Sequence, residues 1–492
     1  MIEQFQQLVL KDISLFIPET ILLITFCVSI LLNLVSKNEK FVAYISIIGI
    51  LFAIYYSFQT IKLKEIIFSG MYVVDGLSSF FKIIIGLTSI YIFLFSFQSD
   101  ELKKIPNRIG EYYSLLIALT LGMFLMTGAN NLIMMYLSIE LSSITSYILS
   151  GVIKEEERGS EAALKYILYG AISSGVMLYG ISIIYGLTQS LNANAIQYLL
   201  FQNGANSIAL MIATIFVIVG FGYKISAVPF HFWTPDVYEG SPITITALLS
   251  VASKGAGFAM MIRFFTEIFS FQEKGIYFNL VQQFDWQMIL GFISVLTMTV
   301  GNMIAIWQTN MKRLLAYSSI AHAGYMLMGL VVLSNEGIVA IMIYFTIYLF
   351  MNLGAFYIVM IIAQKIRSEN IEDYKGLAYR SSFVSVILTI LLISLTGLPP
   401  TAGFIGKLYL FSSLLNAKWF VLAIIGALNS VVSLFYYMKV VRNMFLKQVE
   451  GESSIIQFLF EEKFYMISFA VIVVLFGIYF SPIIEFVKLA VK

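Results

Sequence analysis

Long apolar segments recur along almost the whole chain, and this feature limits most strongly what the chain can fold into. A helix that crosses a membrane needs about 20 mainly apolar residues. Fourteen segments of the 492-residue sequence meet this requirement: residues 13–36, 41–61, 76–98, 112–128, 130–150, 161–187, 206–228, 242–268, 286–306, 310–333, 336–364, 381–415, 418–444 and 463–488. Only 12% of the residues are charged, against about 25% in soluble domains. The sequence therefore predicts an all-α polytopic membrane protein with about 14 transmembrane helices.

Charge, cysteine and histidine content exclude several classes of function. Thirty basic and 28 acidic residues give a formal charge of +2, which leaves no basic excess for binding nucleic acid. The single cysteine, Cys27, excludes a disulfide scaffold, an iron–sulfur cluster and a cysteine-ligated zinc site, and two histidines argue against haem or a di-metal centre. No loop between the predicted spans exceeds about 20 residues, which is too short for a soluble domain. We therefore expect any chemistry to take place in the membrane, with no cofactor or metal on this chain.

Basic residues predict how the chain is oriented. Loops after odd-numbered spans carry 17 of the 30 lysines and arginines, the opposite side with both termini carries 8, and 5 lie inside spans. Cytoplasmic loops are enriched in Lys and Arg, so we expect both termini to face outward. The start, MIEQFQQLVLKD, has no basic region or cleavage site of a signal peptide, and the first apolar segment is expected to be a retained span.

Prolines concentrate in two of the predicted spans. Pro229, Pro235 and Pro242 lie in AVPFHFWTPDVYEGSP, and Pro399 and Pro400 lie in LTGLPPTAGF; the chain has eight prolines in all. Proline removes an amide donor and clashes with the preceding helical turn. Irregular backbone at membrane depth is tolerated where it is buried in protein or lines a wet cavity. The pattern predicts that spans seven and twelve are broken, although kinks that serve packing alone are an alternative.

The two breaks also predict an internal repeat. Spans seven and twelve are five apart, and interrupted spans at matching positions in two halves are typical of transporters. A repeat of five spans has an odd number of crossings, so the second copy is expected to be inverted. We predict N-terminal helices in 1–111, a first repeat in 112–268, a second repeat in 286–444 and a C-terminal helix in 445–492.

Four ionisable residues lie at mid-membrane positions of the predicted spans: Glu140, Lys224, Lys254 and Lys407. Each costs about 2.5–3.5 kcal/mol at the bilayer centre, and together they cost on the order of 10 kcal/mol, comparable to the net stability of a domain. A buried structural ion pair is one alternative, but Glu140 can neutralise only one of the three lysines. These four residues are therefore candidates for an ion pathway.

Two histidines are weaker candidates. His322, in SSIAHAGY, lies midway along its span beside serines, and a neutral histidine that both donates and accepts suits a proton relay. His231 lies between two phenylalanines in the first break. A structural role is the alternative for each, and it is stronger for His231.

Two further lysines have local carboxylates. Lys165 has Glu161 one helical turn away as a partner, so a position at the membrane surface competes with a role in a pathway. Lys82 has Asp75 nearby and is expected to be structural.

Several segments in order resemble one known family. PFHFWTPDVYEGSP, SKGAGF, NMKRLLAYSSIAHAGY and GLPPTAGFIGK, with EAALKYILYGAISS before them, resemble the subunit N family of bacterial respiratory complex I, NADH-quinone oxidoreductase. The resemblance covers nearly the whole chain. It implies fourteen helices with two inverted five-helix repeats, in a proton-translocating subunit of the bacterial inner membrane. It also implies that NADH, FMN, the iron–sulfur clusters and quinone bind other membrane and peripheral subunits.

The same resemblance implies roles for the candidate residues. Glu140 and Lys224 correspond to the family's ion pair at the entry half-channel, Lys254 to its central lysine, and His322 to the link beyond it. Lys407 corresponds to the lysine on the exit side, where glutamate would suggest the sister subunit M.

Two other functions stay open at this point. A subunit of a multisubunit sodium/proton antiporter has the same fold, and a membrane scaffold that conducts nothing is a second alternative. A sodium site would need several oxygen ligands, as other hard cations do. Glu140 is the one carboxylate expected midway along a span, which favours protons.

Overall fold

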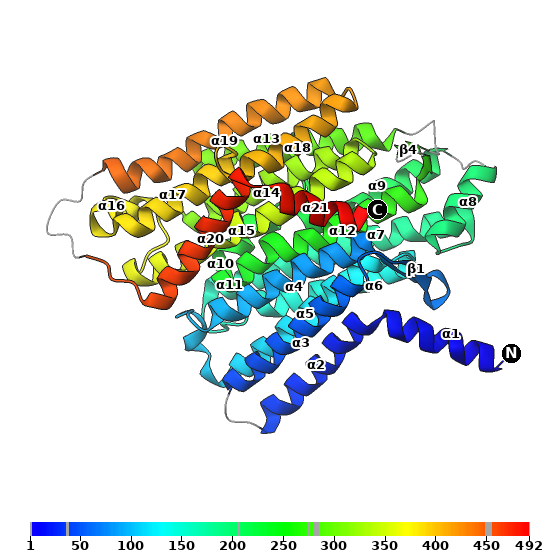
Figure 1. Ribbon diagram of the computed structural model, residues 1–492, viewed down its shortest axis with the longest axis horizontal. Helices are drawn as coiled ribbons and strands as arrows, with labels where there is room; N and C mark the ends of the chain where they lie inside the picture. The colour runs from blue at the N-terminus through cyan, green and yellow to red at the C-terminus, as the bar shows by residue number, and fades with distance from the viewer. Residues whose placement is uncertain are drawn as a thin grey trace.

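The structure is a computed structural model that describes residues 2–35, 39–203, 207–273, 276–279, 285–447 and 455–491. Its helices pack side by side in one bundle, which Figure 1 colours from blue to red along the chain. Three residues counted for the predicted orientation, Lys37, Lys274 and Lys492, lie outside the described residues.

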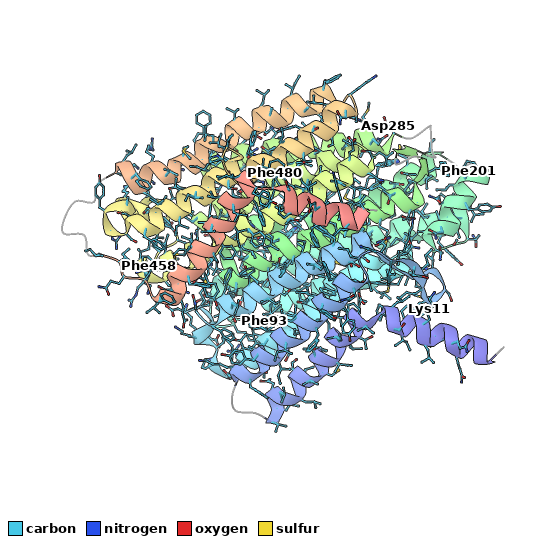
Figure 2. All side chains as sticks on the ribbon, viewed as in Figure 1. Lys11, Phe93, Phe201, Asp285, Phe458 and Phe480 are labelled. Atoms are coloured by element: carbon cyan, nitrogen blue, oxygen red, sulfur yellow. The ribbon has the colours of Figure 1, made fainter. Side chains whose placement is uncertain are left out.

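The N-terminal part contains four helices and a hairpin. Its elements are α1 (Ile2–Leu15), α2 (Ile17–Val35), α3 (Glu39–Gln59), β1 (Lys64–Ile67), the 3-10 turn Phe68–Gly70, β2 (Tyr72–Asp75) and α4 (Gly76–Ser96). The sequence analysis did not predict α1, which extends from the side of the bundle (Figure 1). Lys11, labelled on α1 in Figure 2, pairs with Glu65 of β1 at 3.1 Å and ties α1 to the antiparallel β1–β2 hairpin.

The middle of the chain forms two successive groups of helices. The first consists of the short turns Leu102–Lys104 and Pro106–Arg108, then α5 (Ile109–Gly128), α6 (Leu132–Ser150), α7 (Glu157–Thr188), α8 (Ala193–Asn203), α9 (Ser207–Ile225), α10 (Trp233–Gly240), α11 (Ile243–Leu248), the π-helical turn Leu249–Ser253 and α12 (Lys254–Ile268). The second consists of β3 (Ser270–Glu273), β4 (Ile276–Asn279), α13 (Trp286–Trp307), α14 (Met311–Val331), α15 (Asn335–Ile366), the turn Ile371–Tyr374, α16 (Leu377–Arg380), α17 (Ser382–Thr396), α18 (Ala402–Asn416) and α19 (Phe420–Leu446). Strands β3 and β4 form the second antiparallel hairpin. The helices α20 (Phe460–Ile478) and α21 (Ser481–Val491) follow.

The predicted membrane spans are confirmed as helices. Within the described residues, 12 helices are long and apolar enough to cross a membrane, or up to 13 if α20 and α21, bent by 81°, count as one span. These twelve correspond to predicted spans one to eleven and thirteen. The two remaining spans, 381–415 and 463–488, correspond to the pairs α17/α18 and α20/α21. The chain is a multi-pass membrane protein.

Both predicted breaks are present, and each begins with a residue of positive φ. Helix α9 ends at Ile225, Ser226 follows with φ 63°, and α10 starts only at Trp233. Helix α17 ends at Thr396, Gly397 follows with φ 87°, and α18 starts at Ala402. The prolines in these loops cannot continue a helix, because they lack the amide donor.

The two groups of helices share an arrangement around their breaks. The 32-residue helix α7 packs against both α9 and α10, and the 32-residue helix α15 packs against both α17 and α18. A long helix beside each broken one is what two copies of one five-helix unit would produce. The repeat boundaries 112–268 and 286–444 stay a prediction.

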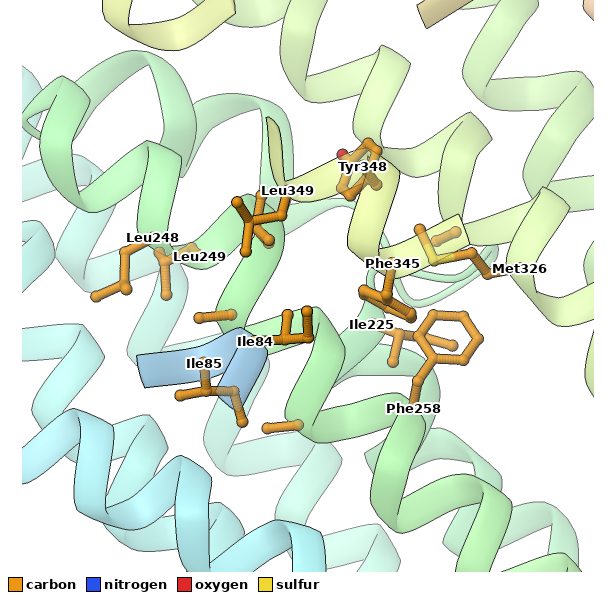
Figure 3. Close-up of a cluster of buried hydrophobic side chains, with 14 of the residues drawn as sticks. Ile84, Ile85, Ile225, Leu248, Leu249, Phe258, Met326, Phe345, Tyr348 and Leu349 are labelled. Carbon is orange, nitrogen blue, oxygen red and sulfur yellow. The ribbon is translucent and has the colours of Figure 1, made fainter. Parts of the chain in front are cut away.

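The most buried helices lie at the centre of the bundle. Almost every residue of α12, of α14 and of the most apolar stretch of α15 is buried, whereas most residues of α2, α7 and α19 are partly or fully exposed. Figure 3 shows Ile225 of α9, Phe258 of α12 and Phe345 of α15 converging, with Ile84 of α4 beside them. Polar residues on α12 and α14 are thus held away from lipid by aliphatic and aromatic packing.

Candidate functional site

Three lysines lie inside the bundle without an ion pair. Lys224 is 2% exposed, Lys254 is 0% exposed and Lys407 is 3% exposed. Among the described residues, none of their amino groups lies within 4.0 Å of a carboxylate oxygen. A buried cation without a countercharge is costly, so neutral oxygen atoms must stabilise these charges.

Lys224 lies at the end of α9, directly before the first break. Its Nζ donates to Ser143 Oγ of α6 at 3.3 Å. Ser143 is three residues after Glu140, so both lie on one face of α6. The structure shows no salt bridge between Glu140 and Lys224, because α9 places the amino group opposite the next turn of α6, and their pairing stays a prediction. Glu140 is half-buried, and its Oε1 has no hydrogen-bond partner.

Lys254 begins α12, directly after the π-helical turn. Its Nζ donates to both the carbonyl oxygen and Oγ of Ser319 on α14, at 2.8 and 2.9 Å. Single π turns within α-helices occur frequently at functional sites. Gly257, three residues on, allows α9 to pack closely, because a Cβ there would lie 2.8 Å from Ile225 and 3.4 Å from Lys224. The stem of Lys224 therefore runs beside the helix that carries Lys254.

His322 of α14 joins three helices through hydroxyl groups. Its Nδ1 lies 2.6 Å from the hydroxyl of Tyr344 on α15, and its Nε2 lies 3.4 Å from the hydroxyl of Tyr437 on α19. The Tyr437 hydroxyl is also 2.5 Å from Ser318 Oγ. Ser318 adjoins Ser319, the partner of Lys254. These polar side chains connect the imidazole of His322 with Lys254, and the connected set is called the polar line below.

This polar line continues toward Lys407. The rings of Tyr436 and Tyr437 are 4.3 Å apart between centroids. Tyr436 donates to Asn302 Oδ1 at 3.1 Å, and Asn302 Nδ2 donates to the Tyr325 hydroxyl at 3.2 Å. The Nζ of Lys407 lies 4.4 Å from the centre of the Tyr325 ring. All these side chains are buried.

Lys407 of α18 forms a hydrogen bond across the second break to the end of α17. Its Nζ donates to the carbonyl oxygen of Thr396, the last residue of α17, at 2.7 Å, and to Ser430 Oγ at 3.1 Å. The last carbonyls of a helix lack partners within the helix and carry its partial negative charge. Gly397 has positive φ, and a Cβ there would lie 2.7 Å from Lys407 Cδ. The broken span thus supplies both the acceptor and the space that the lysine needs.

Lys165 and His231 do not join this line. Lys165 pairs with Glu161 at 2.7 Å, which confirms the expected local partner, and with Asp236 of α10 at 2.6 Å. His231 is buried in the first break, and its Nδ1 has no hydrogen-bond partner. The structure groups Lys165 with surface charges and leaves His231 in the first break.

A charged cavity opens at the end of the bundle where α10 ends and α14 begins. Its volume is about 800 Å³. Lys312 on its wall pairs with Glu101 at 3.2 Å and Glu369 at 2.8 Å. Arg313 pairs with Asp236 at 2.7 Å and Glu239 at 2.8 Å. Here the cations are matched by carboxylates, unlike the three lysines of the interior.

Near the β1–β2 hairpin, the structure corrects the partner predicted for Lys82. Lys82 pairs with Glu19 of α2 at 2.7 Å, and both side chains are fully buried. Asp75 instead pairs with Arg263 of α12, with oxygen–nitrogen distances of 2.9 and 3.0 Å. Arg263 lies inside α12 and is 1% exposed.

Sequence analysis missed the tyrosines of the polar line. A signal was present, because Tyr325 lies one turn from His322, Tyr344 and Tyr348 lie one turn apart, and Tyr436 and Tyr437 are adjacent. In mainly aliphatic spans, such spacing marks a polar face. Within the described part of the chain, no group of three or more His, Cys, Asp or Glu side chains could hold a metal ion.

Comparisons with known proteins show the family. Residues 129–433 match the family model described as NADH:quinone oxidoreductase/Mrp antiporter, TM. The chain is 45% identical over 491 residues to NADH-quinone oxidoreductase subunit N 2 of Chloroherpeton thalassium, covering 97% of this chain and 94% of that relative. The chain belongs to the NADH-quinone oxidoreductase subunit N family. Another subunit N, from Chlorobium chlorochromatii, is 43% identical with the same coverage.

Solved structures share the fold of this subunit N family member. A chain of respiratory complex I from Thermus thermophilus matches with a TM-score of 0.78 and 27% identity, covering 95% of this chain and 98% of that one. A chain of the Mrp complex from Dietzia sp. matches with a TM-score of 0.81 and 16% identity, covering 96% and 97%. The second likeness shows the fold alone. All seven candidate residues lie within the matched region 129–433.

Proposed function

We propose that this chain is the proton-translocating membrane subunit N of a redox-driven NADH:quinone oxidoreductase. Membership of the subunit N family supports the assembly. The observation that carries the transport function is the set of three buried lysines without ion pairs, two of which are joined by serine, histidine, tyrosine and asparagine side chains. Of these groups, hydroxyls and imidazole both donate and accept protons, and the asparagine amide connects them by hydrogen bonds.

Glu140 and Lys224 form the entry in this proposal. Ser143 and Glu140 lie one turn apart on α6, so a modest movement of the Lys224 amino group exchanges one for the other. Beside the carboxylate the lysine keeps its proton, because an opposite charge stabilises the protonated form. Beside the neutral hydroxyl it loses that support and passes the proton toward Lys254, whose helix lies alongside.

Lys254, His322 and Lys407 carry the proton onward. A neutral imidazole accepts at one nitrogen and donates at the other, so His322 can receive a proton from the side of Lys254 and release one through Tyr344 or Tyr437. Lys407, at the end of the polar line, releases the proton at the second break. Lysine suits this work because its ammonium can deprotonate, whereas arginine stays protonated.

The rest of the reaction belongs to partner subunits in this proposal. NADH, FMN, the iron–sulfur clusters and quinone bind the other membrane and peripheral subunits of the complex, and this chain carries out no redox chemistry. The chain lies in a bacterial inner membrane with both termini outward, as the distribution of basic residues predicts.

Two other functions have less support. A sodium/proton antiporter subunit shares the fold, but a sodium ion needs several oxygen ligands, as other hard cations do, and Glu140 is the one carboxylate beside the three unpaired lysines in the described residues. A scaffold that conducts nothing would not explain why three cations are buried without countercharges.

Purification and transport measurements test the proposal together. A tag on this chain should bring down flavin and iron–sulfur subunits with NADH:quinone activity, and sealed vesicles should acidify on NADH addition in sodium-free medium. Dependence of the acidification on sodium would favour the antiporter. Unchanged acidification in Lys254→Ala, with the subunit assembled, would favour the scaffold.

A further inference from the structure

An apolar groove runs along the surface between α17 and α20, away from the polar line. It consists of two adjoining hollows of about 440 and 460 Å³ that share Ala470 and Val471. The lining residues are Ser382, Phe383, Val386, Ile387, Ile390, Ile467, Ala470, Val471, Val474, Leu475, Ile478 and Tyr479. Apart from Ser382 at one end and Tyr479 at the other, the walls are aliphatic or phenyl.

Helix periodicity explains why the groove is continuous. On α20, Phe469 and Val473 are buried, and Phe469 packs against Gly354 of α15. Residues 467, 471, 474 and 478 form the opposite stripe at helical spacing and are partly or fully exposed. Ala470, which is 7% exposed, lies between the two stripes and forms the floor.

The groove has the length of one acyl chain within one leaflet. From Ile467 to Ile478, where α20 ends, the helix rises about 16.5 Å at about 1.5 Å per residue. The hydrocarbon core of a bilayer is about 30 Å thick, so one leaflet is about 15 Å. If the hydrocarbon of one leaflet begins at the Ser382 end of the groove, it ends just before Tyr479.

Two cations stand at the Ser382 end of the groove. Lys463 is exposed and lies one turn before Ile467, on the same stripe of α20. Arg380 is the last residue of α16, two positions before α17 begins. Its carbonyl oxygen accepts from the amide of Ile456, so Arg380 lies beside the segment that leads into α20. Neither side chain has a salt bridge within the described residues.

Nearby carboxylates do not neutralise these cations. Glu462 is engaged by Lys365 at 3.3 Å and by the Leu459 amide at 2.7 Å. Glu461 is two residues from Lys463, a spacing that does not bring side chains face to face on a helix. The end of the groove therefore carries a net positive charge.

We propose that this groove binds an anionic phospholipid, with one acyl chain between α17 and α20 and the phosphate beside Lys463 and Arg380. The apolar walls, about as long as one leaflet, match the acyl chain. The positive charge at one end matches the phosphate. A neighbouring helix would not need the cations, and a neutral lipid would not use them.

Photo-crosslinking of the intact complex tests this proposal. The probe is phosphatidylglycerol with a photoactivatable acyl chain in bilayer nanodiscs, and phosphatidylcholine with the same chain is its reference. We expect α17 and α20 peptides to be labelled at least about fivefold more by the anionic probe, since each basic residue near a lipid surface contributes about 1 kcal/mol.

Paired variants separate the two parts of the site. Lys463→Gln should remove most of the preference for the anionic probe, whereas Lys154→Gln, in the exposed loop between α6 and α7, should not. Val471→Trp should fill the groove and abolish labelling by both probes, whereas Leu428→Trp on the exposed face of α19 should not. Equal labelling by the two probes, no labelling, or a preference that survives Lys463→Gln would overturn the proposal.

Discussion

Buried cations of this protein fall into two groups that differ in their partners. Near the β1–β2 hairpin, Lys82 and Arg263 each face a carboxylate, from Glu19 and Asp75. In the centre of the bundle, Lys224, Lys254 and Lys407 face hydroxyl and carbonyl oxygens. The paired charges are neutralised in place and hold helices together. The central charges are held by neutral groups alone, which allows a proton to be lost as well as kept.

The largest expected effect on stability comes from breaking a paired site. Glu19→Gln leaves the fully buried Lys82 without a countercharge, which costs about 3–5 kcal/mol of unfolding free energy. Thermal denaturation of the purified complex, followed by loss of this subunit, measures it. The double variant Glu19→Leu/Lys82→Met should recover most of the loss.

Glu65→Gln is the matched control for that experiment. It breaks the exposed pair with Lys11, where both side chains are about half exposed, and exposed pairs contribute about 0–1 kcal/mol. If the two single variants lose equal stability, the distinction between buried and exposed pairs fails.

At the central site the same kind of change should affect transport rather than stability. Glu140→Gln removes the carboxylate that stabilises the protonated Lys224 in the proposed entry, and coupled turnover should fall at least about tenfold, since a positioned acid–base group contributes about 10²–10⁴-fold. Glu140→Asp should be milder. Glu161→Gln, which removes a partner of Lys165, is the control. Full pumping in Glu140→Gln would remove Glu140 from the pathway.

A smaller effect is expected where the polar line has parallel branches. Tyr437→Phe removes the hydroxyl between Ser318 and His322, while the contact of His322 with Tyr344 remains. Proton pumping should fall a few-fold, and Tyr357→Phe, whose hydroxyl binds Gln98 elsewhere, should leave it unchanged. A Tyr437→Phe complex that pumps normally would show that protons bypass α19.

A smaller effect on stability than that of Glu19→Gln is expected at a second paired site, and it depends on pH. Burial acts to raise the pKa of Asp75, but the Arg263 guanidinium and hydrogen bonds from Ser78 outweigh it and lower the pKa below its ordinary value. The unfolded chain then binds more protons, so this stabilisation is present above about pH 4 and is lost as the pH falls below it. Asp75→Asn should remove about 1.5–3 kcal/mol at pH 7. Its melting temperature should also fall less than that of the wild type between pH 5 and pH 3.

Sequence predicted the positions of the central charges but not what they contact. A lysine in an apolar span is conspicuous whatever the fold. Lys224, Lys254 and Lys407 could therefore be found from their positions in apolar segments alone. Their partners depend on how α6, α14, α17 and α19 pack, and hydropathy says nothing about that. For this reason the sequence did not indicate that Lys224 would contact Ser143, one turn from Glu140.

The same limit explains the partner predicted for Lys82. Asp75 is near Lys82 along the chain, but Glu19, far away in sequence, reaches it because α2 and α4 both pack against α3 and α5 in the folded bundle. The breaks were predictable, in contrast, because proline acts on its own helix and needs no tertiary partner.

One measurement tests the comparison most directly: the ratio of protons moved to NADH oxidised in sealed vesicles. Lys254→Arg keeps the charge but cannot release a proton, whereas Lys82→Arg keeps a charge whose task is to stay paired. We expect Lys254→Arg and Lys407→Ala to assemble and lose most pumping, and Lys82→Arg to pump as the wild type does. If Lys254→Arg and Lys407→Ala both assemble and keep the wild-type ratio, the central lysines are structural and the account is wrong.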